Sequence, residues 1–202
     1  MAGCEDLIKM DIEPDCDDPI VGGIEANGVI INREDIDTAL TEFDAIRKNV
    51  IKTIAMKSGK KAYKIYVPSN NPFDGTQTTL EVGTLRNSFT NDAGFAVLKN
   101  DPDVVENVID KLANGTFVII FENKFKNINK ATTPGDSTFQ VMGYYQGLKA
   151  TTIENNKYSD ETQGGWKIVL QETKVPKSAL FLYGTSVATT RAMIESLTQL
   201  VP

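Results

Sequence analysis

Thr116–Glu122 reads TFVIIFE, and this stretch decides the fold. It is built almost entirely from β-branched and aromatic residues, which favour strands. Its apolar residues are consecutive rather than alternating, which is typical of a strand with little contact to water on either face. The stretch therefore predicts a core strand that is buried on both faces.

A helix is predicted immediately before this strand, over Asp101–Asn114. Asp101 can cap its first turn, and Pro102 suits the first helical position. Gly115 stands where a C-terminal glycine cap belongs. The helix carries an apolar stripe at i, i+3, i+4 spacing, formed by Val104, Val105, Val108, Ile109 and Leu112.

The chain after the core strand is expected to be mostly sheet. Phe139–Leu148 predicts a strand pair that bends at Gly143 or Gly147, since glycine inside a strand pattern often marks a bulge or a corner. Apolar residues alternate in Trp166–Glu172, which predicts another strand. Ser186–Leu197 has the spacing of a closing helix.

The first half of the chain is expected to hold shorter strands. The first strand signal is Val29–Ile31, and the following stretch, Asn32–Arg47, stays open between helix and strand. A hairpin is predicted from Val50–Met56 and Ala62–Val67, because Ser58-Gly59 forms a turn pair between them. Two further strands are predicted, at Thr78–Val82 and Leu85–Phe89.

These elements together predict an α+β fold. We expect mainly antiparallel strands in a barrel or curled sheet with one flanking helix, near residues 101–114, and an N-terminal arm. The competing architecture is a sandwich. Residues 1–28 form an acidic arm or loop, rich in proline and glycine, and residues 29–202 form a single β-rich domain.

Several classes of function are disfavoured by composition. The 202-residue chain has no histidine, which removes the commonest general base and most zinc sites, and no glycine pattern that cradles phosphate. We therefore expect no enzyme, no catalytic residue, no cofactor and no metal. No apolar run has the length of a membrane helix, and the N-terminus lacks the features of a signal peptide. Cys4 and Cys16 favour a reduced setting, and whether they are bridged stays open.

Charge is distributed in blocks. Residues 1–45 carry a net charge of −11, whereas residues 46–64 carry +7. Asp11–Pro19 reads DIEPDCDDP, and its alternating acids resemble the opening of a calcium loop. That pattern needs a glycine and a glutamate where this chain has Cys16 and Gly22. A solvated arm or an assembly arm fits better.

The two charge blocks are candidate halves of an interface between copies of the chain. Electrostatic complementarity of this kind gives specificity and fast association. A solvated surface is the alternative for both blocks. The candidate interface residues are Asp11, Glu13, Asp15, Asp17, Asp18, Lys57, Lys60, Lys61 and Lys64.

Four segments carry a resemblance to known proteins: the run from Cys16 through IVGGIEANGVIINREDID at residues 20–37, Val108–Lys124, STFQVMGYYQGL at Ser137–Leu148, and Trp166–Thr173 leading to Pro176. In these segments the chain resembles virion structural proteins of phages that infect Bacteroidetes, including the crAss-like phages. The resemblance implies a tail-tube-like or tail-ring fold, a location in the virion after assembly in the host cytoplasm, and no transferable functional residue.

Two functions of different classes are therefore expected. The first is a ring- or tube-forming subunit of the phage tail or head–tail junction, which contacts its own copies and other tail or portal-proximal proteins. DNA would pass through without specific binding, and no membrane is involved. The second is a monomeric binding module that holds a glycan or protein through the loops Ser69–Gly75 and Phe125–Ser137. A capsid accessory protein is a third possibility.

Overall fold

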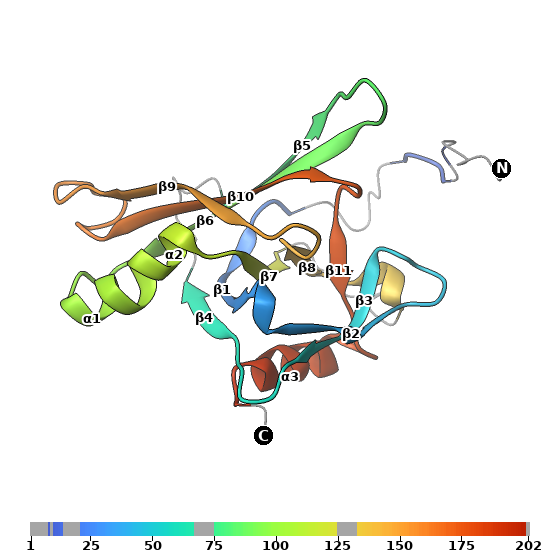
Figure 1. The fold of residues 1–202 in the computed structure, drawn as a ribbon. Helices are drawn as coiled ribbons and strands as arrows, with labels where there is room; N and C mark the ends of the chain where they lie inside the picture. The colour runs from blue at the N-terminus through green and yellow to red at the C-terminus, as the bar shows by residue number, and fades with distance from the viewer. Residues whose placement is uncertain (1–7, 9, 14–20, 67–74, 125–132, 201–202) are drawn as a thin grey trace.

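The computed structural model describes residues 8, 10–13, 21–66, 75–124 and 133–200. These residues form an α+β fold that is mostly strand, with two sheets and two helical segments (Figure 1). A four-stranded sheet lies across the top of a curled seven-stranded sheet in this view, and the C-terminal helix lies at the bottom. The α+β class predicted from sequence is confirmed.

The larger sheet contains seven strands, most of them antiparallel. Its spatial order is β2 (Ile36–Phe43), β3 (Val50–Met56), β11 (Leu180–Leu182), β8 (Phe139–Met142), β7 (Phe117–Asn123), β1 (Ile24–Asn32) and β4 (Tyr63–Tyr66). Only β11 and β3 run parallel to each other. Two strands that follow each other in sequence, β1 and β2, thus stand near opposite edges of the sheet.

The short link between β1 and β2 forces the sheet to curl. A flat sheet would separate these strands by roughly 24 Å, since neighbouring strands lie about 4.8 Å apart. The link is the single 3₁₀ turn η1, Arg33–Asp35, and a connection of that length reaches only about 14 Å. The sheet therefore bends round on itself. Strands β2 and β4 do not pair, so the predicted barrel is not closed and the expectation of a curled sheet fits better.

The smaller sheet contains four antiparallel strands. Its order is β5 (Thr76–Glu81), β6 (Ser88–Val97), β10 (Trp166–Val175) and β9 (Lys149–Asn155). One face of this sheet packs against the outer face of the curled sheet through Ala93, Phe95, Ile168 and Leu170. Strands β5 and β9 form its two edges.

Strand β7 is buried on both faces, as TFVIIFE predicts. Val118 and Ile120 point into a core inside the curl, and Phe117, Ile119 and Phe121 point into a second core between the sheets. All five side chains are at most 5 % exposed. Because alternate residues of a strand face opposite sides, this one strand joins both cores.

The predicted helix before β7 is present and covers the second core. It comprises α1 (Pro102–Val104), a π-helical turn η2 (Val105–Ile109) and α2 (Asp110–Asn114), and Asp101 caps its start by accepting a hydrogen bond from the Val104 N–H. Ile109 and Leu112 are buried, but Val108 is exposed. A π turn holds more residues than an α turn, so it shifts the predicted stripe.

The C-terminal helix α3 (Val187–Leu197) lies where the sequence predicts it. Its residues Val187, Met193, Ile194 and Leu197 pack on the core inside the curl. The helix thus covers the open end of the curled sheet (Figure 1).

A buried carboxylate holds the point where the chain crosses from one sheet to the other. The bend between β8 and β9 lies at Gly143–Gly147, as predicted, with φ +90° at Gly143 and +84° at Gly147. The Glu172 side chain on β10 accepts hydrogen bonds from the backbone N–H groups of Gly143, Gln146 and Gly147 at 3.0, 2.6 and 3.2 Å. Glu172 is 2 % exposed, so its charge is solvated by these donors rather than by water.

Several predicted elements differ in their pairing or bounds. The hairpin predicted from Val50–Met56 and Ala62–Val67 is wrong, because β3 pairs with β2 and β11 while β4 pairs with β1. The ambiguous stretch after Asn32 becomes η1 and β2. Strand β1 begins at Ile24, within the predicted arm, because Ile24 pairs with Asn123 and Gly28 pairs with Phe121. Leu85 lies in the turn before β6 and not in a strand.

We predict that Glu172→Gln lowers the free energy of unfolding by about 2 kcal/mol. The amide would turn its own N–H donors toward backbone N–H groups and leave buried donors unsatisfied. Denaturant unfolding would measure the change. The exposed Glu154→Gln serves as the control and is expected to change stability little. A Glu172→Gln protein as stable as the control would show that the bend holds without the carboxylate.

Candidate functional site

A groove lies between α3 and the strands β1, β4 and β7. It has a volume of about 390 Å³. Its floor is apolar and its rim is charged. The floor consists of Val29, Ile120, Phe139 and Ile194, and the rim of Asn27, Lys64, Glu122, Arg191, Glu195 and Thr198. Gly28 and Phe121 also line the groove, although the Phe121 side chain belongs to the second core.

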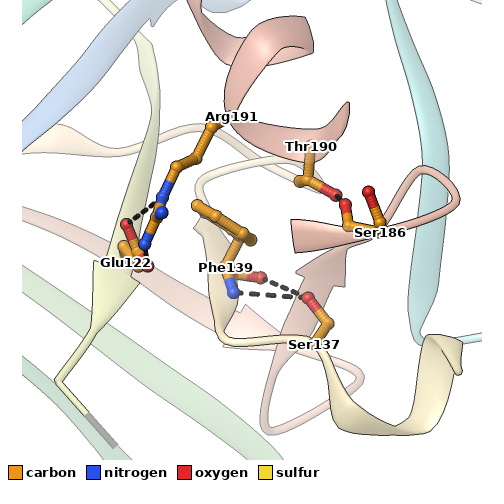
Figure 2. Close-up of polar contacts among 6 residues, drawn as sticks. All are labelled: Glu122, Ser137, Phe139, Ser186, Thr190 and Arg191. Atoms are coloured by element: carbon orange, nitrogen blue, oxygen red, sulfur yellow. Dashed lines mark hydrogen bonds and ion pairs between the residues drawn. The ribbon is translucent and has the colours of Figure 1, made fainter. Parts of the chain in front are cut away.

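The start of α3 is fixed by a dense set of hydrogen bonds. Ser186 and Thr189 form a capping box, in which each side chain binds the backbone N–H of the other. The fully buried Thr190 donates its hydroxyl to the Ser186 carbonyl at 2.7 Å and accepts from the Gly184 N–H. These contacts set the direction in which the next residue, Arg191, leaves the helix (Figure 2).

Arg191 joins the helix to the sheet. Its guanidinium donates two hydrogen bonds to the Glu122 carboxylate on β7, at 3.2 Å from Nε and 2.6 Å from the second nitrogen (Figure 2). The hydrogen bond with Glu122 raises the pKa of Arg191 above its ordinary value. The Arg191 side chain is 51 % exposed and that of Glu122 is 13 % exposed. The pair therefore forms one wall of the groove and stays open to solvent on the arginine side.

The predicted lysine surface is divided by the fold. Lys64 lines the groove. The Lys60 ammonium lies 3.1 Å from the Asp35 carboxylate, and this hydrogen bond raises the pKa of Lys60. Because Asp35 is only 5 % exposed, Lys60 stabilises the fold of its own chain. Lys57 is exposed, and Lys61 lies over the Tyr63 ring at 5.6 Å.

The predicted acidic arm is described only in part. Asp11 and Glu13 are exposed and lie outside any helix or strand. Asp15, Asp17 and Asp18 lie outside the described residues, as do Cys4 and Cys16. Most of the two loops chosen for the binding-module alternative also lies outside them. Of these loops the structure describes only Gly75 and residues 133–137, which include the short 3₁₀ turn η3 (Pro134–Asp136).

The sequence analysis did not predict the Arg191–Glu122 ion pair, nor the exposed apolar residues of the turn between β5 and β6. The turn exposes Val82 at 83 % and Leu85 at 101 %, and the adjacent Leu80 on β5 is 55 % exposed. The signal was available, since Gly83 lies between apolar residues in a stretch that is otherwise polar. The two strands predicted here exist as β5 and β6, but the prediction places Val82 and Leu85 inside them because alternation assigns apolar residues to a buried face.

We predict a coupling energy of about 0.5 kcal/mol between Arg191 and Glu122, in the range of exposed ion pairs. A double-mutant cycle with Arg191→Ala and Glu122→Gln, followed by denaturant unfolding, would measure it. The coupling should shrink at high salt because Arg191 is half exposed.

The matched control is the surface pair Lys167–Glu161, whose charged atoms lie 4.0 Å apart. Its coupling should be smaller than that of Arg191–Glu122. The contact is longer, and neither side chain is shielded from water as Glu122 is, since Lys167 is 36 % and Glu161 43 % exposed. Equal coupling for the two pairs would contradict a special role for Arg191 at the groove.

Within the described part of the chain, no group of three or more His, Cys, Asp or Glu residues is placed to hold a metal ion. No helix among the same residues is long and apolar enough to span a membrane. The protein matches no family model, no curated protein and no solved structure.

Proposed function

We propose that this protein is a structural subunit of a phage virion that assembles with its own copies into a ring or tube around the DNA path. The tail or the head–tail junction is the proposed location. The observation that carries this proposal is the four-stranded sheet, which ends on both sides in a strand with no further partner strand among the described residues.

The two edges of this sheet are β5 and β9. An open edge presents a row of backbone N–H and C=O groups that can pair with another chain. Because the edges differ and lie on opposite sides of the same sheet, β5 of one copy can pair with β9 of the next. Such a head-to-tail contact closes into a ring when the rotation between neighbours allows it.

The hydrogen-bond pattern identifies the outward groups of β5. Gly94 donates its N–H to the Gly75 carbonyl at 2.6 Å, and the register continues without a shift from Thr76 to Glu81. Hydrogen-bonded and non-bonded pairs alternate in antiparallel sheets. The N–H group of Thr78 therefore points away from β6 and toward any strand that docks on this edge.

The setting in a virion is supported by the sequence resemblance to structural proteins of crAss-like phages. The composition agrees with a DNA conduit, since the net charge is −6 and a repulsive lumen lets the polyanion slide without specific binding. The proposed partners are further copies of this chain and other tail or portal-proximal proteins.

We predict that the purified protein assembles into rings or tubes and that Thr78→Pro keeps it monomeric. Proline removes the outward N–H but is tolerated on an edge strand. The matched control is Thr78→Val, which removes the hydroxyl that donates to the Asn91 side chain but keeps the N–H. Light scattering across protein and salt concentrations, with negative-stain images of each species, would measure assembly.

The expected result is assembly of the wild-type and Thr78→Val proteins, with Thr78→Pro folded but monomeric. Circular dichroism would establish that the proline variant retains its fold. A wild-type protein that stays monomeric under every condition would overturn the proposal. Rings that form equally well from Thr78→Pro would show that the β5 edge is not the contact.

A further inference from the structure

The turn between β5 and β6 is an apolar tip that the subunit does not cover. Leu85 and Val82 are among the most exposed large apolar side chains of the described chain. The hairpin extends away from both cores, at the top of the molecule in Figure 1. Two large apolar side chains exposed within one short turn are a candidate contact with another molecule.

The groove beside α3 has the chemistry to receive such a tip. Its floor is formed by buried apolar residues, among them Val29, Ile120 and Phe139. An apolar cavity of about 150 Å³ is enough to bind benzene. At about 390 Å³ the groove has room for two apolar side chains of a hairpin turn.

The charge of the tip matches one unpaired charge on the groove rim. Arg86 is the only charged residue between Glu81 and Ser88, and it is exposed next to Leu85. Glu195 is exposed on the groove rim, near the end of α3. Neither side chain forms an ion pair among the described residues. The rim also carries two cations, Lys64 and Arg191, and Arg191 is paired with Glu122.

The tip and the groove lie at opposite ends of the subunit, with the hairpin at the top and α3 at the bottom of Figure 1. They cannot meet within one chain. The occupant that carries both the apolar side chains and the matching charge is a second copy of this protein.

We propose that the β5–β6 tip of one copy seats in the α3 groove of the next, with Val82 and Leu85 on the apolar floor and Arg86 paired with Glu195. This inference rests on the self-assembly in the proposed function and adds a second contact, distinct from edge pairing of β5 with β9. The contact is head-to-tail, because the two surfaces differ.

Mixed disulfide crosslinking tests the contact. In a background with Cys4→Ser and Cys16→Ser, Thr84→Cys marks the tip and Asn27→Cys marks the groove rim, and both positions are exposed. Oxidation of the two proteins together should give a mixed dimer, and oxidation of either alone should give little. The control partner is Asn107→Cys, exposed on η2, which should give no mixed dimer with Thr84→Cys.

A charge exchange tests the pairing. Arg86→Glu and Glu195→Arg should each weaken self-association about tenfold, and the two together should restore it. The combination of Arg86→Glu with Glu106→Arg, at an exposed position on η2 outside both proposed contacts, is the control and should not restore it. Leu85→Ser should weaken association more than Leu40→Ser, which alters an exposed leucine on β2.

The outcomes separate the two proposals. Rings without the mixed crosslink, or rings indifferent to Leu85→Ser, would overturn the tip contact and leave the ring proposal standing. A mixed crosslink that persists with Thr78→Pro would support the tip contact independently of the sheet edges. Monomers that give neither rings nor a mixed crosslink would overturn both.

Discussion

Burial of β7 on both faces is the constraint on which the rest of the structure depends. Val118 and Ile120 complete the core inside the curled sheet, and Ile119 and Phe121 complete the core beneath the four-stranded sheet. Each fully buried apolar side chain contributes about 2 kcal/mol to the stability of the fold. A polar residue on either face of β7 would therefore destabilise the core on that side. The two sheets are therefore held around a single strand.

The curl of the larger sheet depends on polar contacts in the β1–β2 link as well as on the core. Asp35 lies in the link between β1 and β2, where its carboxylate binds the Lys60 ammonium and the Asn32 amide. The Asp35 carbonyl accepts the N–H of Lys57. These contacts tie the β1–β2 link to the β3–β4 link. Part of the basic block thus stabilises the fold itself. The lysine surface available to a proposed partner is therefore smaller than the sequence implies.

The proposed assembly features lie on opposite parts of this rigid body. Hairpin β5–β6 provides an open strand edge and an apolar tip, and the groove beside α3 provides an apolar floor with a charged rim. Both are held by the cores, since β6 contributes Phe95 to one core and α3 contributes Leu197 to the other. In the proposed assembly, such a rigid body would present its contact surfaces at a fixed angle, which is what ring closure requires.

Several elements could be predicted from the sequence pattern within a single segment. Continuous apolar residues predicted β7, the cap and apolar stripe predicted the helix before it, and glycines predicted the bend after β8. Pairing depends instead on which distant segments share a core. This is why β4 pairs with β1 rather than β3, and why Arg191 meets Glu122 across 69 residues. Composition supplied the charge blocks and the absence of histidine. Only the tertiary structure decided which lysines remain at the surface, which strand edges stay open and where a groove forms, because each is a property of segments brought together in space.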